Sequence, residues 1–393
     1  MSTGRIKRNR LFWFLASFFG ICLLSGALGM RVRAEDETGG LEAGAIGEKI
    51  MEQADIQDID AVLKELFPSE NIRFRDILDS LVKGETDEAG SKAASFIKAA
   101  LTGQLSAAKQ VLAGLLMISV AAALFSRTAK VFHSTQAAEM GFYMMYLLLM
   151  TTSLRHFRMS AESIEVTMEH LLTFMKVLSP AYFVCMAVST GSVTSVAFYQ
   201  IVFVLIYMVE KLILHVVMPV IDLYLVMKVL NELSEEPYLT KAAELMETIV
   251  NWILKAMLAC VTGVSIVQGL LNPAVDAVRR STVARGIEMI PGIGNAAGGT
   301  LEIVLAASVL IKNGIGMAGV AVCAMICLVP FLNVAVPALM YQGLAAVIQP
   351  VAGKQAAEAL GGVANAYKML MKAVGETAVL FFLTIAVAAV FTS

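Results

Sequence analysis

The chain has 393 residues, of which 58% are hydrophobic and only 16% are charged, and its mean hydropathy is +0.74. This composition lies outside the range of soluble globular domains and indicates a polytopic, all-α membrane protein. The formal net charge of -2 conceals an acidic stretch, because residues 35–88 contain 16 Asp and Glu against 5 Lys and Arg.

Residues 1–34 have the layout of a secretory signal peptide. Four basic residues precede an apolar run over 11–24, and Val32-Arg33-Ala34 fits a small-x-small cleavage site. An uncleaved signal anchor is the alternative, because Arg31 and Arg33 lie close to the proposed cut. In both cases the residues that follow are expected to be exported.

Residues 35–100 are expected to form a small, acidic, extracytoplasmic helical segment. Apolar residues recur at helical spacing from Ile46 to Leu66, and Pro68 ends the pattern. A second short helix is expected to end at Gly84. The polytopic transmembrane domain is then expected to occupy residues 101–393.

The first half of this domain is expected to contain spans at 105–125 and 137–154, with Arg127 and Lys130 in the cytoplasm between them. Residues 193–230 are long enough for two further spans. The acidic loop 231–247 is expected to lie outside.

Residues 155–176 have the pattern of an amphipathic helix. Its apolar face comprises Phe157, Ala161, Ile164, Met168, Leu171 and Met175, and its polar face comprises Arg158, Glu162, Glu165 and Glu169. Such a helix lies on a membrane surface or packs against a partner helix, so we do not expect it to span.

The second half is expected to span at 249–271, 315–346 and 376–391, with a semi-polar connector at 349–375. The loop 272–286 is the most basic and is expected to be cytoplasmic because of Arg279, Arg280 and Arg285. The total is about seven spans, with the N-terminus outside and the C-terminus inside.

Two segments are expected to be broken by Gly and Pro and to be re-entrant, at 177–193 and 287–312. Opened backbone is tolerated at membrane depth only beside protein or water, so such segments indicate a pathway or a packing feature. The breaking residues are Pro180, Gly191, Pro291, Gly292, Gly294, Gly298 and Gly299.

Five ionisable residues in apolar runs are candidates for a pathway or for helix packing. Lys211, His215 and Asp222 share one helix face, although Glu210 and Lys211 could instead mark a turn at the membrane surface. Glu302 and Lys312 lie inside the run 286–341, where pairing with a neighbouring helix is as reasonable as a role in transport.

Motifs for enzyme chemistry are lacking in the sequence. Gly292-Ile-Gly294-Asn-Ala-Ala297 resembles a dinucleotide fingerprint, but it has no βαβ context. There is no phosphate-binding G-x-x-x-x-G-K-[ST] loop, no H-E-x-x-H helix and no cysteine pattern typical of metal sites; the four cysteines after the signal segment are expected to be buried. We therefore expect a non-enzymatic protein with no cofactor, no bound metal and no nucleic-acid partner.

Residues 290–316, IPGIGNAAGGTLEIVLAASVLIKNGIG, together with residues 178–192, LSPAYFVCMAVSTGS, resemble the stage III sporulation protein AE family. The signal layout and the acidic exported segment fit the same family. The most specific part is the Ala-Ser-x-Leu-x-Lys-Asn run at 307–313. The family often has a second acidic residue before the position of Glu302, where this chain has Gly299.

The resemblance implies a membrane component of a channel or export complex that joins the mother cell to the engulfed forespore. It implies ring-forming partners and a cytoplasmic ATPase, and a place in the mother-cell membrane around the forespore. A structural membrane platform for partner proteins and an independent secondary transporter are the alternative functions.

Overall fold

The computed structural model describes residues 59–61, 63–64, 86–131, 135–190, 193–234, 238–288, 294–352 and 354–390. All regular structure in these ranges is helical, as the composition predicts. The signal segment, most of the predicted acidic segment, Gly191, Pro291 and Gly292 lie outside them. The main elements are α5 (Thr86–Val131), α6 (Thr135–Thr190), α7 (Val193–Leu212), a π-helical turn η1 (Ile213–Val217), α8 (Met218–Leu233), α9 (Thr240–Glu288), α10 (Gly294–Ala352) and α11 (Lys354–Val390).

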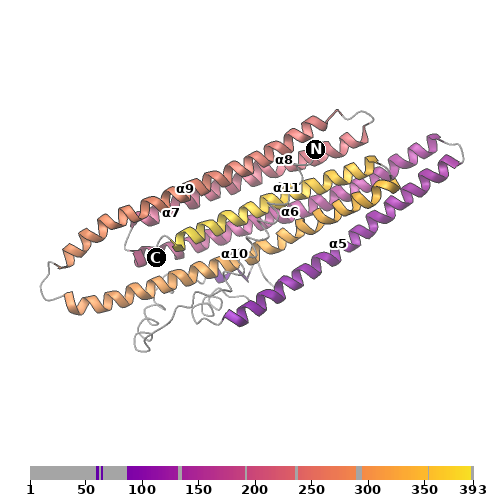
Figure 1. Ribbon diagram of the computed structural model, residues 1–393. Helices are drawn as coiled ribbons and strands as arrows, with labels where there is room; N and C mark the ends of the chain where they lie inside the picture. The colour runs from indigo at the N-terminus through magenta and orange to yellow at the C-terminus, as the bar shows by residue number, and fades with distance from the viewer. Residues whose placement is uncertain are drawn as a thin grey trace.

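The helices form one elongated bundle in which they run side by side (Figure 1). α10 packs along α11, α6 and α5, and α11 also packs against α6, α7, α8 and α9. α11 is therefore the central helix. Its buried residues include Leu360, Tyr367, Leu370 and Phe381, each 0% exposed. The region 349–375, predicted to be a connector, thus supplies much of the core.

Several helices are far longer than a membrane is thick. α10 has 59 residues and α6 has 56, so at 1.5 Å per residue each measures roughly 85 Å, against about 30 Å for a hydrocarbon core. These helices must continue beyond the bilayer.

Four helical stretches in the described residues are long and apolar enough to cross a membrane: Leu101–Ala121, Gln200–Leu233, Thr240–Val264 and Gly316–Pro350. The structure confirms an all-helical chain with several candidate spans. It does not confirm the predicted count of seven.

The prediction of two spans within 193–230 is wrong, because α7, η1 and α8 follow one another without a break. Glu210 and Lys211 lie within this continuous helical rod and form no turn. At η1 the N–H of Met218 bonds to the carbonyl of Ile213, five residues back. Pro219 follows at the start of α8; it lacks an N–H, and its ring crowds the preceding turn, which favours this wider turn.

Three of the predicted helix breaks lie inside helices. Pro180 is within α6, and Gly298 and Gly299 are within α10, which begins at Gly294. The re-entrant breaks predicted at these three residues are therefore not found. Packing against neighbouring helices supports a proline or glycine in a long helix better than intrinsic propensity predicts.

The apolar stripe predicted on 155–176 is confirmed, whereas its isolation as a separate helix is not. All six stripe residues are buried, from Ile164 at 0% exposed to Ala161 at 4%. The segment is the middle of α6, which packs against α5, α10 and α11 of the same chain. The stripe therefore belongs to the core of this protein itself.

The C-terminal ends of α5, α8 and α10 lie toward one end of the bundle (Figure 1). We call it the groove end, after the polar groove described below. Arg127 and Lys130 of α5 thus lie at the same end as the α8–α9 connection. The sequence prediction placed them on opposite sides. The prediction divided the continuous rod of α7, η1 and α8 into two spans. This added one membrane crossing and so reversed the predicted side of the membrane for every later loop.

The start of α5 and the end of α9 both lie toward the other end of the bundle (Figure 1). The signal layout predicts an outside position for the former, and the arginines at 279–285 predict an inside position for the latter. In a bundle that crosses one membrane, these two predictions exclude each other.

We expect cysteines introduced at Ser91 and Ser281 to be labelled from one side of the membrane and a cysteine at Tyr238 from the other. Candidate spans Leu101–Ala121 and Thr240–Val264 separate the first two positions from the groove end, and Tyr238 is 77% exposed. The measurement is labelling of whole cells and inverted vesicles with an impermeant thiol reagent, in a background without native cysteines. If the cysteines introduced at Ser91 and Ser281 were labelled from opposite sides of the membrane, the result would contradict this arrangement.

Candidate functional site

Glu210 is a carboxylate in the interior of the bundle. Its side chain, on α7, is 0% exposed. Thr377 of α11 donates a hydrogen bond from Oγ1 to Glu210 Oε2 at 3.1 Å, while Glu210 Oε1 is buried and has no hydrogen-bond partner. A buried carboxylate with one hydroxyl donor is costly in a membrane protein and usually marks a functional or assembly site.

A second carboxylate, Glu376, stands next to Thr377 on α11. Its Oε1 is also buried without a hydrogen-bond partner. Glu376 lies against the backbone of Leu258 on α9 and is repelled by Glu210, and Glu210 also acts on the fully buried Cys323 of α10. We call Glu210, Glu376 and Thr377 the buried carboxylate site; it lies where α7, α9 and α11 pack together.

None of the three residues that were predicted to share one helix face is fully buried. His215 and Asp222 are exposed and Lys211 is half-buried, whereas Glu210, their neighbour, is inside. The π-helical turn changes the register between α7 and α8, so spacings counted on a regular helix do not hold across it. Nδ1 of His215 donates a hydrogen bond to the carbonyl oxygen of Lys211 at 2.9 Å.

Asp222 lies beside the polar face of α6. It interacts electrostatically with Arg158 and Glu162, and Glu165 is in turn repelled by Asp222 and Glu169. Arg158 forms an ion pair with Glu162 at 3.1 Å, with both side chains exposed. We call Glu162, Glu165, Glu169 and Asp222 the acidic strip. Asp222 is inside the candidate span Gln200–Leu233, where a carboxylate that faces lipid carries a large cost.

Glu302 and Lys312 both lie on α10, before the candidate span Gly316–Pro350. Their side chains are outside the described residues. Their role in a pathway, or in pairing with a neighbouring helix, therefore stays a prediction. Among the cysteines, Cys323 and Cys327 are buried as predicted, while Cys260 is exposed, contrary to the prediction.

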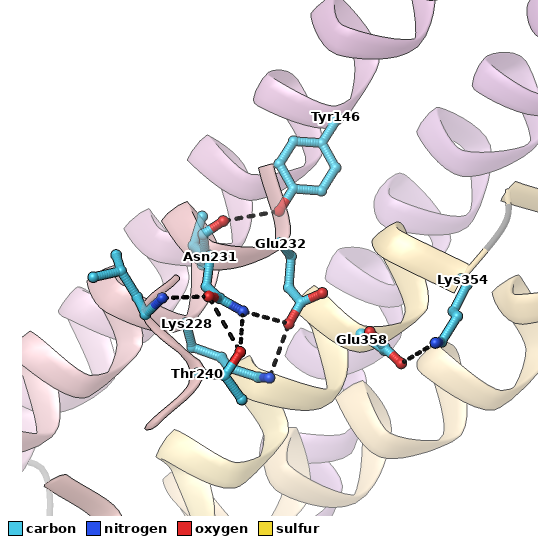
Figure 2. A network of polar contacts seen from close by, with 9 residues as sticks. Tyr146, Lys228, Asn231, Glu232, Thr240, Lys354 and Glu358 are labelled. Carbon is cyan, nitrogen blue, oxygen red and sulfur yellow. Dashed lines mark hydrogen bonds and ion pairs between the residues drawn. The ribbon is translucent and has the colours of Figure 1, made fainter. Parts of the chain in front are cut away.

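A polar groove of about 750 Å³ opens where α8, α9, α10 and α11 end or begin. Figure 2 shows the network along it: Lys228 pairs with Glu232 at 2.9 Å, and Asn231 binds Glu232, Thr240 and the N–H of Leu239. Tyr146 of α6 donates a hydrogen bond to the carbonyl of Val229. These contacts fix the α8–α9 connection. The sequence analysis missed the groove because its residues come from four helices.

Gly362 allows α11 to approach α8 closely at this groove. A Cβ at position 362 would lie 2.4 Å from Cγ of Lys228, whereas nothing lies within 4 Å of a Cβ at the adjacent Gly361. The stem of Lys228 therefore occupies the space that Gly362 leaves, and this positions its ammonium group against Glu232.

We expect Gly362→Ala to destabilise the bundle by about 1–3 kcal/mol, since the Lys228 stem must move and its ion pair with Glu232 is disturbed. Gly361→Ala is the matched control and should be neutral or stabilising by about 0.5–1 kcal/mol, because alanine favours a helix. Thermal unfolding midpoints of the purified variants in detergent test this. Equal midpoints for the two variants would contradict the close approach.

Comparison with known proteins gives one consistent result. A family model described as stage III sporulation protein AE matches residues 72–392. A protein of Bacillus subtilis (strain 168) named "Stage III sporulation protein AE" is 24% identical over 280 residues, which are 71% of this chain and 70% of that protein. No solved structure matches the chain.

Proposed function

The chain belongs to the stage III sporulation protein AE family, and from this premise we propose that it is a membrane subunit of a channel or export complex joining mother cell and forespore. In this proposal the protein lies in the mother-cell membrane that surrounds the forespore. Its partners are other stage III membrane proteins, ring-forming subunits and a cytoplasmic ATPase.

One observation carries the proposal. The family match over 72–392 contains every helix from α5 to α11. The whole bundle, with its four candidate spans, is thus the unit that the family shares. We propose a non-enzymatic role for it, with energy supplied by a partner, because the sequence has no nucleotide-binding loop of the Walker type.

The acidic strip supports a pathway over a purely structural platform. Asp222 lies in a candidate span and interacts electrostatically with Glu162 and Glu165 of α6, and a carboxylate at that depth needs water or protein beside it. A water-filled passage between this chain and a neighbouring subunit would supply that environment, and like charges along it would favour cations.

We expect Gln at positions 162, 165 and 169 with Asn at 222 to leave complex assembly intact and to reduce heat-resistant spores at least tenfold. The pathway would lose its charge while the helix surfaces keep their shape. The control replaces Lys241 and Glu244, an exposed ion pair on α9, with Gln. Parent-like spore counts for the strip variant, with the complex assembled, would favour the structural platform.

A further inference from the structure

The buried carboxylate site has the features of an ion-binding site, independently of the proposed role in sporulation. We propose that Glu210, Glu376 and Thr377 bind one monovalent cation, either a proton or a sodium ion, inside the bundle. A proton and a sodium ion would act alike here, because each places a single positive charge between the two carboxylates.

The need for a cation follows from the oxygens that have no partner. Glu210 is completely buried, yet its Oε1 makes no hydrogen bond; Glu376 is half-buried, and its Oε1 is also buried without a hydrogen-bond partner. Each unpaired buried oxygen costs about 1–3 kcal/mol, and more when charged. Repulsion between the two carboxylates adds to that cost. One cation would offset both effects.

The nearby basic groups are engaged elsewhere. The ammonium of Lys211 lies 6.0 Å from the ring centre of Tyr207, and Nζ of Lys372 donates a hydrogen bond to Asn251. The buried thiol of Cys323 on α10 also interacts electrostatically with Glu210. Within the part of the chain that the structure describes, Glu210 therefore forms no ion pair that would neutralise it.

The irregular helix backbone close to Glu210 also favours the binding of a cation. The π-helical turn η1 starts three residues after Glu210, at Ile213. Such turns are frequent at functional sites, and carbonyls of irregular helix turns coordinate sodium ions and protons in transporters. Carboxylate, hydroxyl and carbonyl oxygens are the ligands that hard cations prefer.

Cation binding would also affect the packing of the bundle. The site joins α7 to the central helix α11 through the Glu210–Thr377 hydrogen bond, and Glu376 lies against the backbone of α9 at Leu258. A bound cation would stabilise the folded chain in proportion to its concentration.

The test is the thermal unfolding midpoint of the purified full chain in lipid nanodiscs. One series replaces choline chloride with sodium chloride at constant ionic strength and pH 8. The other lowers the pH from 8.5 to 5.5 without sodium. We expect a saturable rise of about 3 °C or more in the first series for a sodium site. For a proton site the rise occurs only in the second series, because proton uptake by the folded state stabilises it at low pH.

Glu210→Gln should abolish the rise, since the amide keeps the shape and the Thr377 contact but loses the charge. Thr377→Val should weaken it, which provides a second variant should Glu210→Gln fold poorly. Glu358→Gln is the control, because Glu358 is exposed and pairs with Lys354, and it should respond like the parent. A parent chain insensitive to both sodium and pH, or a Glu210→Gln chain that responds like the parent, would overturn the proposal.

Discussion

The variant Ile164→Asp is expected to prevent the chain from accumulating in a folded form. Ile164 is 0% exposed at the centre of the apolar stripe of α6, and α6 packs there against α5, α10 and α11. The aspartate would either bury an unpaired charge or force the helices apart, and such changes cost more than about 4 kcal/mol. This is a large part of the stability of a typical domain.

Val166→Asp is the matched control, because Val166 lies two residues further along α6 and is 51% exposed. The measurement is the amount of monodisperse protein recovered from membranes by size-exclusion chromatography. We expect near-parent recovery for Val166→Asp and little for Ile164→Asp. Normal recovery of Ile164→Asp with defective complex assembly would show that the stripe is a docking surface for another protein.

Tyr367→Ala is expected to destabilise the bundle by about 3–5 kcal/mol, the range for removing a large buried aromatic ring. Tyr367 is 0% exposed on α11. Its ring stacks on Tyr341 of α10 at 5.5 Å and meets Phe157 of α6 edge-on at 5.1 Å. Its hydroxyl lies 3.2 Å from Oγ of Ser160. The residue therefore joins three helices.

Tyr367→Phe separates the ring from the hydroxyl. It keeps both ring contacts and removes only the hydrogen bond with Ser160, so we expect a cost of about 0.5–1.5 kcal/mol. Thermal unfolding in detergent compares the two variants with the parent. Equal losses for Phe and Ala would mean that the hydroxyl, and not the aromatic cluster, holds these helices together.

The helical class and the stripe of α6 could be predicted because they follow from local periodicity. The apolar residues of 155–176 recur at helical spacing, and every member of that face is buried. Ile59 and Leu63, also placed on a helix by their spacing, are 0% exposed. A repeating pattern identifies which face is buried, but it does not identify what covers that face.

The spans could not be predicted equally well, because hydropathy measures composition and not the position of a helix in the bundle. The several lysines of residues 349–375 predict a connector, but Ala359, Val363 and Ala366 are completely buried. Small side chains there let α11 approach its neighbours closely. Packing against neighbouring helices likewise explains why Pro180 does not interrupt α6 and why Gly298 and Gly299 do not interrupt α10.

The buried carboxylate site could not be found from spacing alone. Glu210 and Lys211 are adjacent, and only the packing of α7 against α11 shows that the first is inside while the second is not. Glu376 is 166 residues away in sequence, so no local motif connects the two. A signal was nevertheless present, because both carboxylates stand in strongly apolar surroundings.

The most direct test of the central claim is purification of the tagged chain from sporulating cells of its own organism, followed by quantitative mass spectrometry. The claim is that this chain is a subunit of a multi-protein membrane complex. We predict that other stage III membrane proteins and a cytoplasmic ATPase co-purify in fixed ratios with the parent chain and with the control variant Glu358→Gln. A chain that purifies alone from cells that form spores, intact and at its normal level, would contradict the claim and indicate an independent transporter.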